Sequence, residues 1–116
     1  MENKPTKYYS NIQEKSVARS LGGTQVRGSG ASPFSKGDVR LDKILIECKT
    51  SETVNTSYSV KKRVLEKAKD EARAMHKYYS ILAFNFGPGT DNYYVIDEDT
   101  AKFLINKITE EYKITE

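Results

Sequence analysis

The alternation of hydrophobic and polar residues over residues 38–49 constrains the fold more than any other feature of this sequence. A period of two is typical of β-strands that bury one face. With Asp42-Lys43 as a two-residue loop, the segment forms a β-hairpin in which Val39 pairs with Ile46. One face carries Val39, Leu41, Ile44, Ile46 and Cys48, and the other carries Asp38, Arg40, Leu45, Glu47 and Lys49. The first face is the expected core, and the second is a candidate site.

The same register places Asp38 directly across from Glu47, with Cβ atoms about 5 Å apart. Two ionised carboxylates this close repel each other, so we expect a divalent cation between them. Oxygen ligands with room for water suit Mg²⁺, with Mn²⁺ as a possible substitute. Lys49 projects from the same face, and an ammonium group beside such a cation points to phosphoryl chemistry. The alternative is a solvent-facing strand whose charged residues form ordinary surface ion pairs.

The length of 116 residues fits a single domain over residues 1–116. Cys48 and His76 are the only residues of their types, which excludes an intramolecular disulfide and zinc sites built on His and Cys. The lone inward-facing thiol and the lack of an apolar signal segment predict a cytoplasmic protein. No apolar run is long enough to span a membrane, and no P-loop or other motif predicts a small-molecule cofactor.

Charge is unevenly distributed along the chain: the net charge is +4 over residues 60–90 and −4 over residues 91–116. The basic part includes a predicted helix over residues 60–77, capped by Ser59. Its apolar positions are Val64, Ala68, Ala72 and Met75. Clustered Lys and Arg attract phosphates, so this helix is a candidate DNA-binding surface. Several of its charged residues are also spaced for i,i+4 ion pairs, which would explain part of the pattern without a ligand.

Hydrophobic spacing predicts a first helix from Ser10 to Leu21, with Glu14 on its apolar stripe. A carboxylate on such a stripe needs a partner, and the hairpin site is the obvious one. Strands are expected over residues 24–27, 81–86 and 93–96, and Asp97 or Asp99 caps a last helix. The order of helix, three strands, helix, two strands and helix predicts an α/β or α+β fold with a mixed sheet. The tyrosine pairs at 8–9, 78–79 and 93–94 would suit base stacking, a subunit interface or ordinary half-buried packing.

The chain resembles the PD-(D/E)-x-K nuclease superfamily. The resemblance is carried by Glu14 on the first helix, Arg27-Gly28-Ser29-Gly30, Asp38 and Glu47-Cys48-Lys49, in that order. It looks most like the small Holliday-junction resolvases of archaea and of some bacteriophages, over about residues 13–97. The resemblance implies a restriction-endonuclease-like mixed sheet flanked by helices. For a bacteriophage protein, it implies the host cytoplasm as the location.

The resemblance also implies a metal site. By this resemblance, Asp38 and Glu47 would bind Mg²⁺ with the help of the Cys48 carbonyl, and Glu14 would support the metal directly or through water. Bound Mg²⁺ would lower the pKa of water and stabilise charge on the phosphoryl group. Gly37 departs from the superfamily pattern, because it stands where the name has proline.

The implied catalytic set is completed by Lys49, which positions the attacking water, and by Ser29, which touches the scissile phosphate. The candidate DNA-binding residues are Lys15, Arg19, Arg27, Gly28, Ser29, Gly30, Lys36, Lys61, Lys62 and Arg63. The implied activity is metal-dependent cleavage of branched DNA. Cutting two opposed strands of a four-way junction calls for two sites, so we expect a homodimer. The alternatives are a nicking or restriction-type nuclease acting on linear duplex, and a DNA-binding module without catalysis.

Overall fold

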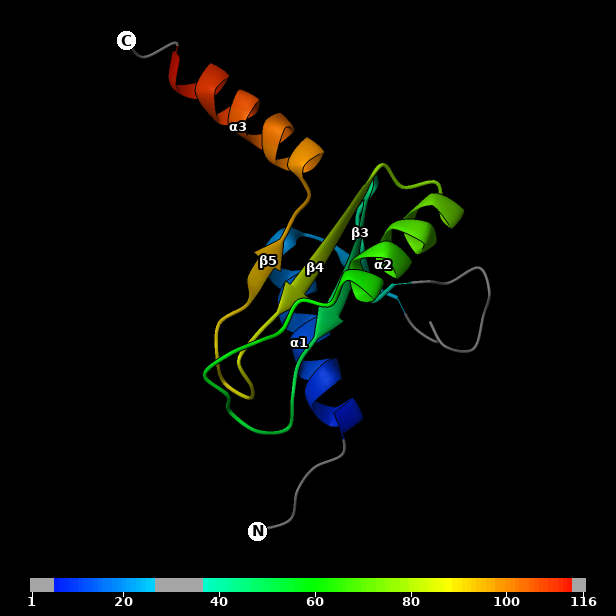
Figure 1. Cartoon of the computed structure of the whole chain (residues 1–116), viewed down its shortest axis with the longest axis vertical. Helices are drawn as coiled ribbons and strands as arrows, with labels where there is room; N and C mark the ends of the chain where they lie inside the picture. Colours follow the sequence, from blue (N-terminus) through cyan, green and yellow to red (C-terminus); the bar gives the residue numbers. More distant parts are fainter. Residues whose placement is uncertain (1–5, 27–36, 114–116) are drawn as a thin grey trace.

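The computed structural model describes residues 6–26 and 37–113 (Figure 1). These residues form α1 (Thr6–Leu21), β1 (Thr24–Gln25), β2 (Val39–Arg40), β3 (Ile44–Lys49), α2 (Lys62–Ala74), β4 (Tyr79–Phe84), β5 (Tyr93–Val95) and α3 (Glu98–Lys113). The five strands lie in one sheet in the order β1-β2-β3-β4-β5. The predicted order of elements and the α+β fold with a mixed, helix-flanked sheet are confirmed.

The predicted hairpin forms between β2 and β3. Val39 pairs with Ile46, and the Leu41 N–H donates to the Ile44 carbonyl over 2.9 Å. β3 then runs parallel to β4, and α2 is the crossover between them. The other neighbouring strands are antiparallel, which makes the sheet mixed. The candidate strand β3 is therefore the central strand.

The main core lies between α1 and one face of the sheet. Val17 of α1 is fully buried against Val39, Ile46 and Ala83. Ala18, Leu41, Ile44, Cys48 and Ile81 pack around them. The apolar face predicted for the hairpin is therefore the core face.

The opposite face of β3, predicted as a candidate site, is partly covered, unlike the solvent-facing strand that was the alternative. Leu45 was assigned to the polar face, yet it is only 3% exposed. The crossover helix α2 contacts β3 and β4 and buries Ala68 and Ala72. A crossover between parallel strands covers the face it crosses, so the central strand is buried on both sides. The polar residues of β3 therefore meet a helix as well as solvent.

Several predicted boundaries are wrong. α1 begins at Thr6, so Ser10 lies inside the helix rather than at its cap. α2 is shorter than predicted, and its N-cap is Lys61, without a side-chain hydrogen bond, rather than Ser59. β4 begins two residues earlier than predicted, at Tyr79. The N–H groups of residues 78 and 79 both donate to the carbonyl of Lys43, so the chain already lies beside β3 where β4 begins.

The last helix, α3, extends away from the rest of the molecule (Figure 1). Asp97 caps it as predicted, because its Oδ1 accepts a hydrogen bond of 2.9 Å from the Thr100 N–H. Only the Thr100 side chain of α3 is buried among the described residues, and its large apolar side chains are exposed. None of the described helices combines the length and apolar character needed to cross a membrane.

Candidate active site

Asp38 is fixed by three hydrogen bonds at the start of β2. Its N–H donates to the Ile46 carbonyl over 3.0 Å, and its carbonyl accepts from the Val26 N–H over 2.9 Å. Its carboxylate Oδ2 accepts a 2.7 Å hydrogen bond from the Cys48 N–H. Burial raises the pKa of Asp38, against the lowering effects of the Cys48 hydrogen bond and of Lys49. The backbone of neighbouring strands therefore sets the position of this carboxylate.

Glu47 lies on β3 and is the most strongly perturbed carboxylate of the site. Burial, followed by repulsion from Asp38, raises its pKa to about 7. Its Oε1 lies 3.7 Å from Lys49 Nζ, as expected for residues two positions apart on one strand face. The positive charge of Lys49 lowers the pKa of Glu47, but by less than burial raises it. Removing a carboxylate from water costs more free energy than attraction to one partly exposed cation supplies.

Glu14 approaches from α1. It is half-buried, and burial followed by repulsion from Asp38 raises its pKa. Gln25 of β1 holds this side chain, because Gln25 Nε2 donates to Glu14 Oε1 over 3.2 Å and to Asn11 Oδ1 over 2.8 Å. The predicted partner of Glu14 was the hairpin site, and the residue of that site whose charge acts on Glu14 is Asp38.

The charges of all three carboxylates act on Cys48. Burial of the thiol, and then the charges of Asp38, Glu14 and Glu47, raise the pKa of Cys48 well above its ordinary value. A thiol shifted in this direction is not a nucleophile at neutral pH. Cys48 therefore contributes its main chain and its packing to the site.

The backbone conformation at position 37 explains why this residue is glycine. Its φ is +77°, which proline cannot adopt because its ring fixes φ near −65°. A Cβ atom at this position would lie 2.5 Å from Leu45 Cγ. In this chain, only glycine allows the backbone to pass the buried leucine and deliver Asp38 to the strand.

The crossover helix α2 completes the site from above β3. Lys67 Nζ lies 3.9 Å from Glu71 Oε1, and both charges act on Asp38 and Glu47. A cavity of about 320 Å³ opens between helix and strand, lined by Glu47, Lys49, Arg63, Val64, Lys67 and Ala68. Three cations around one carboxylate make the cavity suitable for an anion such as phosphate.

The donor set fits a hard divalent cation. Glu14, Asp38 and Glu47 all offer carboxylate oxygens, and the repulsion of Glu14 and Glu47 by Asp38 is what a cation would relieve. In the residues that the structure describes, no three His, Cys, Asp or Glu side chains surround a common point as metal ligands.

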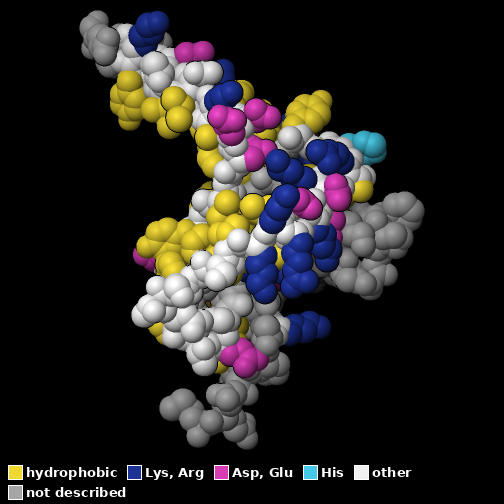
Figure 2. Space-filling view, viewed as in Figure 1, with side chains coloured by type: hydrophobic (Ala, Val, Ile, Leu, Met, Phe, Trp, Pro, Cys, Tyr) yellow, Lys and Arg dark blue, Asp and Glu magenta, His cyan; other side chains and the backbone are white. Residues whose placement is uncertain are grey.

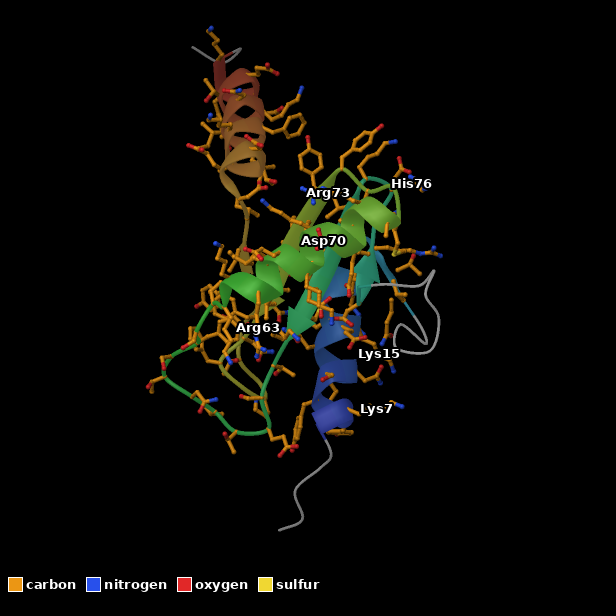
Figure 3. The ribbon with its side chains drawn as sticks, turned by 45° about the vertical axis from the view of Figure 1, so that its right-hand side comes forward. Lys7, Lys15, Arg63, Asp70, Arg73 and His76 are labelled. Atoms are coloured by element: carbon orange, nitrogen blue, oxygen red, sulfur yellow. The ribbon has the colours of Figure 1, made fainter. Side chains whose placement is uncertain are left out.

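Half of the predicted DNA-binding residues lie outside the described ranges. These are Arg27, Gly28, Ser29, Gly30 and Lys36. The other half, Lys15, Arg19, Lys61, Lys62 and Arg63, are exposed. Figure 2 shows Lys and Arg side chains gathered over α2, and Figure 3 shows Arg63 in its first turn and Lys15 on α1. The exposed cations therefore come from both helices that cover the sheet.

Sequence reasoning missed three residues that position the site. Gln25 donates a hydrogen bond to Glu14. Glu71 of α2 adds a negative charge that raises the pKa of Asp38 and of Glu47. Gln13 is only 3% exposed, and its Nε2 donates to the Lys49 carbonyl over 2.9 Å. Its position four residues before the buried Val17 was a signal that its side chain faces the core.

The raised carboxylate pKa values predict that stability falls as pH rises. An unfolded glutamate loses its proton near pH 4.5, whereas Glu47 keeps it to about pH 7, so ionisation between these values destabilises the fold. With chelator present, the free energy of unfolding in urea should fall by up to about 3 kcal/mol across this window. Glu47→Gln should remove most of the decrease.

Added Mg²⁺ provides the control for this prediction. It should raise the urea midpoint of the wild-type protein above pH 7, and should have little effect on Glu47→Gln. A stability that stays constant or increases over the same pH range in chelator would contradict the assigned environment of Glu47.

Comparison with known proteins finds no matching family model, no matching curated protein and no matching solved structure.

Proposed function

We propose that this chain is a metal-dependent endodeoxyribonuclease that cuts branched DNA in the manner of a Holliday-junction resolvase. The observation that carries the proposal is that the carboxylates of Glu14 and Glu47 each lie close enough to Asp38 to be repelled by its charge, with Lys49 3.7 Å from Glu47. The adjoining cavity, with its lysine and arginine lining, supports phosphate as the group that meets these residues. The resemblance to the PD-(D/E)-x-K nucleases agrees with this assignment.

Asp38, Glu47 and the Cys48 carbonyl would hold Mg²⁺, or Mn²⁺ in its place, and Glu14 would support it directly or through water. When bound, the cation supplies positive charge that activates water and stabilises the developing phosphoryl charge. Hydrolysis adds the oxygen of water to phosphorus and breaks one phosphodiester P–O bond.

The protein's own groups prepare this reaction. Lys49 would orient the attacking water, because its ammonium lies 3.7 Å from Glu47 and its side chain lines the cavity. Arg63 and Lys67 line the same cavity and would balance the charge of the phosphate. Ser29 keeps the role of a phosphate contact as a prediction from sequence.

The α2 cations should determine the salt dependence of DNA binding. Arg63→Ala should weaken binding of a junction similarly for all arm sequences, because phosphate contacts carry no sequence information. It should also reduce the slope of log affinity against log salt by about 0.9. Titrations by fluorescence anisotropy at several salt concentrations measure both effects.

Lys102→Ala on α3 is the matched control, because it removes an exposed cation from the acidic C-terminal part of the chain. An Arg63→Ala slope equal to that of the Lys102→Ala variant would rule out α2 as the DNA-binding surface.

The proposal includes a homodimer, because a four-way junction presents two equivalent strands to be cut. The surface that suits the second copy is α3. Leu104, Ile105, Ile108 and Tyr112 share one helical stripe and are 42–67% exposed. Most of the stability of a helix in a protein comes from packing of its apolar face, so a partner packed on this stripe would stabilise α3.

A cleavage assay separates the candidate functions. A labelled four-way junction and a linear duplex of the same sequence are incubated with Mg²⁺, with Mn²⁺ or with chelator. Metal-dependent paired nicking of the junction alone supports a resolvase. Equal cutting of both substrates would indicate a nuclease for linear DNA, and binding without cutting in any metal would indicate a nonenzymatic module.

A further inference from the structure

A second cavity lies on the α1 side of the sheet, at the carboxyl ends of β3 and β4. It has a volume of about 420 Å³ and is formed by residues 8–16 of α1, by Thr50 and Asn85 directly after the two strands, and by Pro88, Gly89, Thr90 and Asn92. The volume falls in the range of small-ligand sites, roughly 300–1,000 Å³. Ligands of open α/β sheets bind at this edge. We call this cavity the α1 pocket.

The lining of the α1 pocket is aromatic and polar but uncharged. Tyr8 and Tyr9 contribute rings in an edge-to-face arrangement, with centroids 5.2 Å apart. Gln13, Asn85 and Asn92 contribute amides, and no Asp, Glu, Lys or Arg among the described residues lines it. Flat rings with convergent amides match the faces and edges of a neutral heterocycle.

The floor of the pocket is tied to the candidate active site. Gln13 directly precedes Glu14, and its Nε2 donates to the carbonyl of Lys49. Its Oε1 is buried and receives no hydrogen bond from the described residues. The pocket and the carboxylates thus share α1 and the end of β3.

We propose that the α1 pocket binds an unpaired nucleobase of the DNA strand held at the candidate active site. This inference depends on the proposed action on DNA. The cations of α2 suit the phosphates, which are charged, whereas the neutral pocket suits a base, which is not. Bases at the centre of a branched substrate are easier to unstack than those in a continuous duplex. Base capture would therefore favour branched substrates without reading their sequence.

Binding of single strands with and without bases tests the proposal. The probes are a fluorescein-labelled oligothymidylate and an abasic oligomer of equal length, measured by anisotropy in chelator so that no cleavage occurs. The wild-type protein should bind the oligothymidylate on the order of tenfold more tightly. Tyr9→Leu should bring this ratio close to one. Tyr78→Leu, which removes a 74% exposed ring at the other end of β4, should leave it unchanged.

A crosslinking experiment on the wild-type protein keeps the proposal testable if Tyr9→Leu does not fold. An oligomer containing 4-thiothymidine should crosslink to residues 8–16 or 85–92. Equal affinity for the two oligomers, or a crosslink confined to other segments, would overturn the assignment. Displacement by free thymidine at equal nucleotide concentration would also overturn it, in favour of a nucleoside site. Neither measurement needs metal or cleavage. Base binding at the α1 pocket can therefore be tested even if the protein proves not to be a nuclease.

Discussion

Asp38→Asn should slow cleavage of a four-way junction by at least about 10²-fold, the typical effect of removing one preorganised electrostatic group. Asparagine keeps the shape of the side chain, and its Oδ1 can still accept the hydrogen bond from Cys48. The substitution therefore removes charge with little change to the fold. Junction affinity should be unchanged or higher, because a negative charge beside the phosphates is lost. Single-turnover cleavage with Mg²⁺ and anisotropy in chelator measure the two effects.

Asp42→Asn is the matched control for this substitution. Asp42 lies in the loop of the same hairpin, its side chain is 90% exposed, and it forms an ion pair with Lys43 at 3.9 Å. Removing its charge should leave cleavage unchanged, because exposed pairs of this kind contribute little. Near-normal turnover by Asp38→Asn, or equal losses in the two variants, would contradict the assignment of Asp38.

Ile108→Glu should convert the proposed homodimer to monomers. Ile108 is central to the apolar stripe of α3, and an unpaired carboxylate there would have to be buried when two copies associate. We expect the dimer dissociation constant to rise roughly 10²-fold or more, because each 1.4 kcal/mol corresponds to a factor of ten. Sedimentation velocity at micromolar concentration measures the change. Paired nicking of the junction should give way to single nicks.

Asn106→Glu is the control on the same helix, because position 106 lies on the side of α3 opposite the stripe. It introduces the same charge and should leave the dimer intact. A wild-type protein that sediments as a monomer with and without DNA would count against the dimer and the resolvase. It would leave the nuclease proposal open.

The local parts of the fold could be predicted because their signals are local. Strict alternation defined the hairpin, and the register of Val39 with Ile46 followed from the short loop. The cap at Asp97 followed from residue type and position. The order of elements then indicated a mixed sheet.

Long-range packing could not be predicted in the same way. The burial of Leu45, which was assigned to the face of the candidate site, was not predicted, because alternation tells two faces apart but does not say whether both are covered. The start of β4 depends on the carbonyl of Lys43, a residue more than thirty positions away. The hydrogen bond from Gln25 to Glu14 forms because β1 packs beside α1, and no sequence motif predicts that contact.

Asp38 is held by main-chain groups of three neighbouring segments, so its position depends little on which side chains those segments carry. Its partners are a carbonyl of residue 46 and the N–H groups of residues 26 and 48, which every amino acid except proline can supply. Surface residues of these strands are thus free to change while the acid keeps its place. Two proteins with this scaffold could therefore place the same acid in the same position at low sequence identity.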